Sequence, residues 1–581
     1  MDMIQQFFET PSYAPHRQYE ALRAYLYEKL SAKEVAKKYG YSEASLYCFA
    51  SRFKKQLAAN QAEKRFFASL DIGRPAKKHH DNIDQLVIEL RKKYLSVSDI
   101  KAIIDTQASG VSETYIFHLL KREGFARLPR RSKKVKMQSQ ITTHLKAPAT
   151  TLLTMDEEIF STAHVGILCF LPYLMETGLH TIIENSLFPE TKTLPKINAI
   201  LSFVALKLSN IKRYTSDNLW CMDRGCGLFA GLNVLPKAAW FSSYSHRVTR
   251  EMNLDFLKAM HQLWQKKGLL SDTTNLDFVT IPYWGDDSHL ENNWSGTRHI
   301  ALSSILAAIA QDPDTGLITY GDTTVRHENE SNVVVEFLDF YKQAGGGKEL
   351  KYLVFDSKFT TYENLSKLDD NDIKFLTIRR RGKNIVDQLN QLPNTDWKKI
   401  RVKTSKHKTR QLRVIDQIIF LKKYGKEIRQ VAITGHGKIK PALIISNDFD
   451  LSTESIIRKY ARRWLVEKSI SEQTHFFHLN KVSSSMVIKV DFDLTMTILS
   501  HNLYRLLASD LAGFEHLTPN SLYEKFICNS GSVSIQNKEI VVSMKKKRNL
   551  PELLTAMSHF NPMNIPWLGK QKLTINAASN T

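Results

Sequence analysis

The sequence predicts a multidomain protein with an α-helical N-terminal region, an all-α middle domain and an α/β core that a β-rich insertion interrupts. The 581 residues are enough for several domains, and 43% hydrophobic residues are enough for a sizeable core. Apolar residues recur at helical spacing as far as residue 270, whereas β-branched, strand-like runs begin at residue 275. The fold class follows from this change of pattern.

The net charge of +22 is distributed unevenly along the chain. Residues 1–150 carry +12 and residues 371–440 carry +14, whereas residues 271–370 carry −10. A chain this basic usually has a polyanionic partner. The longest uncharged apolar run has 11 residues, too short to span a bilayer. No signal peptide is visible, and five cysteines fit a reducing compartment. We therefore expect a cytoplasmic, nucleic-acid-binding protein without a membrane partner.

Residues 1–60 predict a helix-turn-helix unit. The expected helices span residues 17–30, 32–39 and 43–55. Ser31 and Glu34 form a capping box at the start of the second helix, and Gly40 begins the turn before the third. The third helix would present Arg52 and Lys55 to DNA. An ordinary three-helix bundle with a solvated basic face is the alternative.

Residues 81–136 repeat this pattern and end in a basic tether. The expected helices span residues 83–94, 98–104 and 113–123. The last helix would offer Lys121 and Arg122 to DNA, and the tether that follows includes Arg130 and Arg131. The linker arm between the two units, residues 61–80, places Arg74 in a Gly-Arg-Pro segment, and Arg can enter a narrow minor groove. A plain polar linker is the alternative reading of this arm, and residues 137–154 are a second linker.

Residues 155–270 alternate apolar helical patterns with short polar breaks, and we expect an all-α domain. Cys221 and Cys226 lie in it as an isolated pair without a second pair of ligands. The spacing therefore predicts two partly buried thiols rather than a zinc module.

Residues 271–379 predict the first part of an α/β core. The expected strands span residues 276–281, 302–310, 317–325, 352–355 and 373–378, with a helix at 328–341 before the fourth strand. Three meandering strands, a helix and a further strand are the order expected of an RNase H-like fold. Asp277 lies inside the first strand and Asp356 directly follows the fourth. Those strands are neighbours in this fold, so the two carboxylates would converge.

A third carboxylate is expected from a long helix at residues 452–473. Tyr460, Arg463, Trp464 and Glu467 share one face of it. Asp277, Asp356 and Glu467 would then hold two Mg²⁺ ions, for which Mn²⁺ can substitute. One ion would activate the attacking water or 3′-hydroxyl and the other would stabilise the leaving oxygen. Glu472 is the alternative third ligand.

The pattern Tyr460-x₂-Arg463-x₃-Glu467 resembles the signature helix of bacterial insertion-sequence transposases of the DDE class. The full signature continues through six residues to a Lys, where this chain has Thr474; Lys468 and Lys481 are the alternatives. The segment that begins at Asp356 is similar to the family's second-Asp segment. The resemblance covers roughly residues 160–510. On the shared helix face, Arg463 and Tyr460 would reach the neighbouring phosphates, and Trp464 would also contact DNA.

The resemblance also implies a β-rich insertion before the Glu helix. Residues 380–440 are strand-like at 399–402, 411–421 and 429–434, and the basic run at their start consists of Arg379, Arg380 and Arg381. Trp397 would stack on a base, or it is an exposed structural Trp. The core resumes over residues 441–512. The C-terminal region, residues 513–581, would support dimerisation or DNA contact.

The pattern as a whole favours a transposase that binds the terminal inverted repeats of a mobile element and catalyses metal-dependent strand cleavage and strand transfer. The expected partners are double-stranded DNA, both element ends and target, and further copies of the chain in a dimer or higher oligomer. The expected location is the bacterial cytoplasm, at the nucleoid. The alternatives are a catalytically inactive DNA-binding regulator and a nuclease that cannot join strands.

Overall fold

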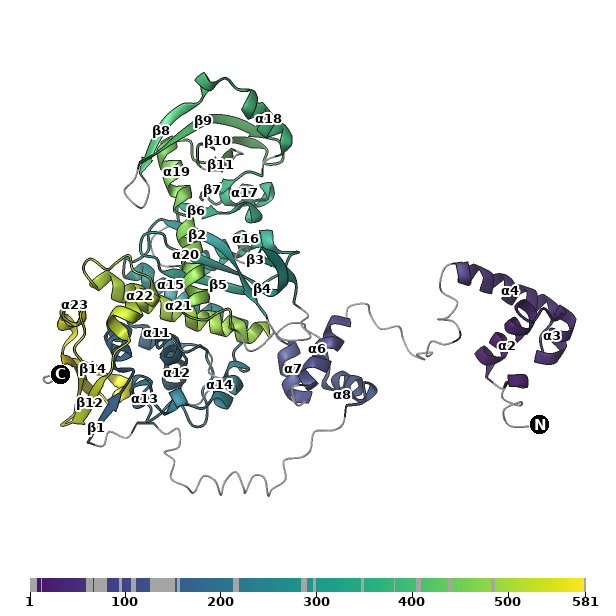
Figure 1. Ribbon diagram of the computed structural model, residues 1–581, viewed down its shortest axis with the longest axis horizontal. Coiled ribbons are helices and arrows are strands. Elements are labelled where there is room, and N and C mark those ends of the chain that lie inside the picture. Colours follow the sequence, from purple (N-terminus) through teal and green to yellow (C-terminus); the bar gives the residue numbers. More distant parts are fainter. Residues whose placement is uncertain are drawn as a thin grey trace. The chain divides into compact units, whose positions relative to one another are not determined.

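The protein is described by a computed structural model (Figure 1). It describes residues 8–11, 13–58, 66, 81–92, 97–105, 111–125, 152–153, 157–212, 219–283, 290–295, 299–345, 350–380, 382–403, 409–436, 441–481 and 486–578. The chain divides into two compact units, residues 1–81 and 82–581. The structure is multidomain, with a helical N-terminal region and a large mixed sheet in the second unit.

In the described part of the first unit lie the helices α2 (Ala14–Leu26), α3 (Ala32–Tyr39) and α4 (Glu43–Ala58). They pack around Ala21, Val35, Tyr39 and Leu46. The expected capping box is present, because Ser31 Oγ accepts from the Glu34 amide while the Glu34 carboxylate accepts from the Ser31 amide. Gly40 ends α3 at φ 69°, a conformation that glycine adopts without strain.

A second set of three helices begins the second unit. These are α6 (Asp81–Lys92), α7 (Val97–Asp105) and α8 (Glu113–Arg122). Their core contains Val87, Ile100, Ile116 and Leu119. Ser112 caps α8 by accepting from the Tyr115 amide at 3.1 Å.

The core sheet has ten strands in the order β3-β4-β2-β6-β7-β11-β10-β9-β8, with β5 paired to β4 (Figure 1). Its first half consists of β2 (Thr273–Pro282), β3 (Asn292–Ser295), β4 (Ile300–Gln311), β5 (Ile318–Val325), β6 (Tyr352–Phe355) and β7 (Lys374–Ile378). The strands β2, β4 and β5 are antiparallel neighbours, whereas β2, β6 and β7 run parallel. Helices α16 (Val333–Ala344) and α17 (Tyr362–Asp369) connect β5 to β6 and β6 to β7.

The β-rich insertion extends this same sheet. Its strands are β8 (Lys398–Lys403), β9 (Thr409–Leu421) and β10 (Lys426–Thr434), and β11 (Ala442–Ser446) follows. β11 pairs antiparallel with both β10 and β7, which joins the insertion to the core strands. The insertion also contains one helix that the sequence did not predict, α18 (Lys383–Gln391).

A single helix was expected over residues 452–473, but two are present. α19 (Thr453–Ala461) ends at Arg462, and α20 (Trp464–His475) begins after Arg463. The Asn275 side chain of β2 donates to the Arg462 carbonyl at 3.0 Å. A side-chain donor satisfies a carbonyl at the helix end, so the break is anchored to the strand that carries Asp277.

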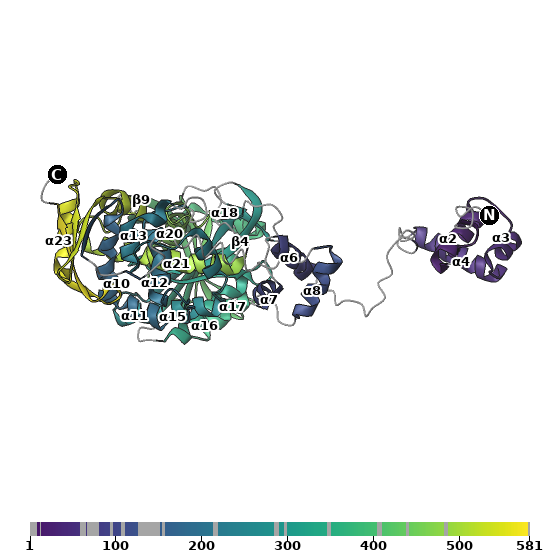
Figure 2. The same ribbon diagram turned by 90° about the horizontal axis from the view of Figure 1, so that it is seen from below.

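The helices of the middle segment are α10 (Leu171–Thr177), α11 (Leu179–Asn185), α12 (Lys196–Leu208), α13 (Arg224–Phe229), α14 (Ala238–Ser245) and α15 (Arg250–Lys266). Together with the buried helix α21 (Val487–Asp510) they contribute much of the largest hydrophobic core. Figure 2 shows α11, α15 and α16 in a row along one side, in agreement with their contacts. Helices α15 and α21 pack on β5, while α20 packs on β2. In the described part of the chain no single helix could span a membrane; one bent pair, 165–177 with 179–185, meets the length and composition criteria together.

The all-α expectation for residues 155–270 was wrong at one place. β1 (Glu158–Thr162) belongs to a second sheet, of order β1-β12-β13-β15-β14. The other strands of this sheet come from the C-terminal region: β12 (Gly531–Gln536), β13 (Glu539–Met544), β14 (Met563–Ile565) and β15 (Gln571–Ala577). Helix α22 (Pro519–Leu522) precedes β12, and helix α23 (Leu550–Met557) lies between β13 and β14. β1 has five residues, and its partner β12 lies more than 350 residues away. A short strand with so distant a partner leaves little local signal.

Candidate active site

The parallel register of β2 and β6 brings Asp277 and Asp356 to the same level of the sheet. Thr273 pairs with Tyr352, and the register continues to Leu276 opposite Phe355. Asp277 follows Leu276 inside β2, and Asp356 follows Phe355, the last residue of β6. Adjacent strands lie about 4.8 Å apart, so the two carboxylates leave neighbouring strands side by side.

Asp277 is a buried carboxylate with several charged side chains nearby. Its side chain is 13% exposed, and its Oδ1 accepts from the Phe278 amide at 2.8 Å. Burial raises its pKa to about 6, Arg463 opposes that rise, and the charges of Asp356 and Glu467 add to it. Both other predicted carboxylates therefore act on Asp277, which indicates that the three side chains share one site.

Arg463 joins two of these carboxylates. Its Nη1 donates to Asp277 Oδ2, and its Nη2 donates to Glu467 Oε1 at 2.6 Å. The Arg463 guanidinium lies 5.8 Å from the centre of the Tyr460 ring. Burial raises the pKa of Tyr460 to about 12. The contacts of Arg463 and Tyr460 with phosphates stay a prediction; in the structure Arg463 pairs with two of the carboxylates.

The two candidate third ligands on α20 point to different surroundings. Glu467 is 55% exposed and pairs with Arg463. Glu472 is 11% exposed, and its nearest charged and titratable neighbours are Lys468 at 3.9 Å and His501 at 3.7 Å. Of these two glutamates, therefore, only Glu467 contacts the group that bridges to Asp277.

The carboxylate site fits divalent cations by the chemistry of its donors. Hard oxygen donors of this kind are the ligands of Mg²⁺ and Mn²⁺. Among the described residues these three carboxylates do not all gather within 4.8 Å of one another; Arg463 lies between two of them. A guanidinium held there indicates that the local field favours a positive charge.

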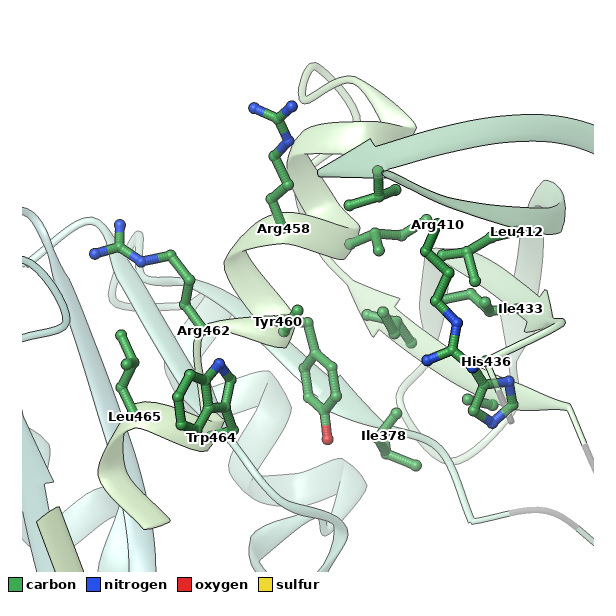
Figure 3. Close-up of a pocket in the computed structure, with 15 residues that line it drawn as sticks. Ile378, Arg410, Leu412, Ile433, His436, Arg458, Tyr460, Arg462, Trp464 and Leu465 are labelled. Atoms are coloured by element: carbon green, nitrogen blue, oxygen red, sulfur yellow. The ribbon is translucent and has the colours of Figure 1, made fainter. Parts of the chain in front are cut away.

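A cavity of about 680 Å³ lies beside the carboxylate site, between α19 and α20 and the strands of the insertion (Figure 3). Its wall is mostly aliphatic, including Leu412 and Ile433, and Arg410 and His436 lie on the side opposite Trp464. In Figure 3, Tyr460 points between Trp464 and Ile378. The cavity therefore combines aromatic rings, an apolar wall and cationic groups at the start of the helix that carries Glu467.

Of the two tryptophans predicted to contact DNA, Trp464 is 46% exposed and lines this cavity. Trp397 packs against the apolar cluster of Leu389, Ala432 and Leu443 within the insertion. Arg410, His436 and Lys358 were not among the predicted site residues. Lys358 lies two residues after Asp356, and its Nζ is 5.9 Å from the centre of the Phe278 ring. Its closeness to Asp356 in the sequence could have indicated that it lies near the carboxylate site.

The predicted basic residues are placed as follows. Arg52 and Lys55 are exposed on α4, and Lys121 and Arg122 are exposed on α8. Arg122 also pairs with Glu123 and Asp84. Arg379 donates to Gln430 Oε1 at 2.7 Å, and Arg380 is exposed. Arg74, Arg130, Arg131 and Arg381 lie outside the described residues.

Comparison with known proteins gives a family match for the central part of the chain. Residues 272–503 match the family model of the transposase DDE domain. No curated protein sequence matches the chain. A solved structure, the cryo-EM structure of the piggyBac transposase synaptic complex with hairpin DNA, is similar over 63% of this chain and 80% of that chain, with 11% sequence identity and a TM-score of 0.33. The span that the family model matches includes Asp277, Asp356 and Glu467.

Proposed function

We propose that this chain is a DDE transposase that cuts and joins DNA at the ends of a mobile element, because residues 272–503 match the family model of the transposase DDE domain. Asp277, Asp356 and Glu467 are the proposed metal ligands. The single observation that carries the assignment is the convergence of their charges: Arg463 pairs with Asp277 and Glu467, while Asp356 directly follows the strand that pairs with β2.

The proposed chemistry needs two divalent ions, Mg²⁺ or Mn²⁺, which when bound would activate the attacking oxygen and stabilise the leaving oxygen of a phosphodiester. The chain's own part is to hold the three carboxylates. Asp277 and Asp356 are fixed by β2 and β6, and Glu467 by the first turn of α20. The arrangement of β2, β4 and β5 with β6 and β7 supports an RNase H-like core.

We assign end recognition to the two N-terminal helical sets. Each consists of three short helices, and the last helix of each exposes basic residues, Arg52 and Lys55 on α4 and Lys121 on α8. These helices would enter the major groove as helix-turn-helix readers of the terminal inverted repeats. Paired ends require at least two copies of the chain, and the proposed place of action is the bacterial nucleoid.

We assign the cavity beside Glu467 to an unpaired base of the DNA end. Base–aromatic stacking contributes about 1–3 kcal/mol per base, and Trp464 and Tyr460 supply rings in a largely aliphatic pocket. A volume of about 680 Å³ is ample for a nucleobase and its sugar. Arg410 and His436 would meet the adjoining phosphate.

The decisive experiment incubates the purified full-length protein with DNA that carries the element's ends, with Mg²⁺ or Mn²⁺. We expect nicking and joining, both lost in Asp356→Ala. Glu363→Gln is the matched control, because Glu363 is an acidic residue of the neighbouring α17 that is 79% exposed and pairs only with Lys367 among the described groups. Unchanged nicking by Asp356→Ala would overturn the assignment.

The same assay separates the two rival functions. Site-specific binding without cleavage would identify a DNA-binding regulator. This alternative is considered because Thr474 stands at the position of the signature Lys. Cleavage without joining would identify a nuclease.

The readers are tested by removing residues 1–136. We expect the truncated chain to lose specific binding to end DNA, and the full chain to bind with steep salt dependence because several Lys and Arg side chains displace counterions. Binding that is insensitive to salt, or specific binding that survives the truncation, would contradict the proposed readers.

The base pocket is tested with 2-aminopurine at each of the terminal positions of the end DNA. Trp464→Ala should abolish the change in fluorescence on binding and weaken the end complex by about 5- to 100-fold. Trp397→Ala is the matched control, because Trp397 packs within the insertion. Equal losses of signal in the two variants would exclude a stacking role specific to Trp464.

A further inference from the structure

A second cluster of ligating side chains lies outside the carboxylate site, in the middle helical segment. His164, Asp223 and Cys226 each direct one ligand atom to a common place, and these atoms lie within 4.8 Å of one another. His164 follows β1, Asp223 precedes α13, and Cys226 lies in the first turn of α13. Nothing in the DNA-processing function uses these residues.

The first turn of α13 holds the carboxylate and the thiol together. Asp223 is the N-cap, and its Oδ1 accepts from the Cys226 amide at 2.9 Å. Thr162 Oγ1 donates to the same carboxylate at 2.8 Å. Gly225 allows this approach, because a Cβ at that position would lie 2.4 Å from Thr162 Oγ1. The Cys226 amide and the Thr162 hydroxyl therefore hold the Asp223 carboxylate in place beside Cys226.

The separation of the nitrogen and oxygen donors is compatible with a tetrahedral metal ion. His164 Nδ1 lies 3.2 Å from Asp223 Oδ2. Zn–N and Zn–O bonds of about 2.0–2.2 Å at a tetrahedral angle place N and O about 3.3 Å apart. His164 Nδ1 is also a buried nitrogen that completes no hydrogen bond of good geometry within the described part of the chain. The ring nitrogen and the carboxylate are thus close to each other without being aligned.

We propose that His164, Asp223 and Cys226 bind a zinc ion. Thiolate, imidazole and carboxylate are zinc ligands, and a soft sulfur donor disfavours Mg²⁺. Cys226 is fully buried, whereas Asp223 lines a cavity of about 430 Å³ together with Thr162, Ser530 and Lys545. This cavity gives the ion a way in from the side of Asp223.

A metal at this place would fasten two parts of the fold to each other. His164 lies two residues after β1, which is an outer strand of the C-terminal sheet. Asp223 and Cys226 belong to the helical segment that carries α12 and α13. Zinc would therefore tie the edge of the C-terminal sheet to the helical core, in a structural role that is independent of strand cleavage.

The test uses Co²⁺ as a spectroscopic substitute for zinc in the full-length protein, made metal-free with a chelator and kept reduced. We expect one tightly bound Co²⁺ that gives a thiolate-to-cobalt charge-transfer absorption and is displaced by Zn²⁺. Cys226→Ser should abolish the absorption. Asp223→Asn keeps a helix-capping side chain and should weaken binding, and Thr162→Val, which removes a hydrogen bond to a ligand, should weaken it by about 10- to 100-fold.

Control variants keep the result specific. Cys221→Ser and Cys169→Ser replace the two other buried thiols of this segment, and the double variant Cys48→Ser/Cys528→Ser removes both exposed thiols; each should retain the absorption. The alternative is an ion pair in which Asp223 and Cys226 raise the pKa of His164 to about 10. No charge-transfer absorption in the folded parent protein, or an absorption that survives Cys226→Ser, would overturn the zinc site in favour of that ion pair.

Discussion

The carboxylate site and the His164 cluster both hold acidic side chains around a place that favours a positive charge, but they differ in donors and in construction. The carboxylate site has three oxygen donors from two strands and a helix, and Arg463 provides its cation. The His164 cluster has one nitrogen, one oxygen and one sulfur donor, gathered by a single helix turn and the end of a strand. The oxygen set suits Mg²⁺ and the mixed set suits zinc.

This difference implies that the two sites can be separated by experiment. Oxygen-only sites select metals weakly and exchange them readily, whereas thiolate sites bind zinc tightly. One protein can therefore keep a structural ion at one place while its reaction depends on another ion elsewhere.

The largest expected effect is the loss of cleavage in Asp277→Asn. Removing a metal ligand costs several kcal/mol of transition-state stabilisation, so we expect the cleavage rate to fall on the order of 10³-fold or more. The thiolate-to-cobalt absorption should be unchanged in this variant. In Cys226→Ser the pattern should reverse, with the absorption lost and the cleavage rate within a few fold of the parent at a temperature where both proteins are folded.

A single variant that loses both properties would contradict the separation. Circular dichroism and gel filtration of each variant distinguish this outcome from misfolding. If folded Cys226→Ser cannot cleave end DNA, the two sites are coupled, and the His164 cluster belongs to the catalytic machinery.

The second effect concerns Arg463. Its side chain is largely buried between Asp277 and Glu467, and removing one partner of a buried ion pair costs about 3–5 kcal/mol. Arg463→Gln should therefore lower the free energy of unfolding by about that amount in urea without divalent metal. Mg²⁺ should restore more stability to this variant than to the parent, because it supplies the missing positive charge.

Arg458→Gln is the matched control for that measurement. Arg458 is on the adjacent helix α19, is half exposed and pairs with Glu454 at 2.7 Å, and exposed pairs of this kind contribute about 0–1 kcal/mol. Equal destabilisation by the two substitutions would show that Arg463 does not neutralise the carboxylate site.

Most of the carboxylate site could be predicted from the sequence because each part leaves a local pattern. Asp277 interrupts a β-branched run, Asp356 follows an apolar strand, and Tyr460, Arg463 and Glu467 have helical spacing. The strands of the insertion were also visible as alternating runs. The extension of the core sheet by the insertion was not, because it depends on the pairing of β11 with β7, more than 60 residues apart.

The His164 cluster could not be predicted for the same kind of reason. His164 lies 59 residues before Asp223 in the sequence, and the spacing of Asp223 and Cys226 is that of an ordinary helix cap. Likewise, the break at Arg462 depends on a hydrogen bond from Asn275, which lies on a different element. Features made by contacts between distant segments leave no periodicity to read.

The smallest expected effect concerns Glu472, which lies on the same helix as Glu467 but is buried away from the carboxylate site. Burial raises the pKa of Glu472 to about 7, and Lys468 and Arg505 only partly oppose this. His501 cannot form a true ion pair with it, because burial lowers the pKa of His501 to about 3. Glu472 is thus a strongly perturbed carboxylate with no contact to the metal-binding residues, and Glu472→Gln should leave the cleavage rate unchanged.

We expect the effect of Glu472→Gln to appear in the free energy of unfolding. The pKa of Glu472 rises on folding from an ordinary 4.5 to about 7, so the native state binds more protons than the unfolded state in this window, and stability falls as pH rises through it. Gln carries no charge and avoids this loss. Glu472→Gln should therefore match the parent near pH 4.5 and exceed it at about pH 8, by at most about 3 kcal/mol. Comparing the two proteins at each pH in urea cancels other titrating groups, including Asp277. A difference that does not change with pH would mean that Glu472 is already paired in the native protein, and its role as the third metal ligand would then have to be reconsidered.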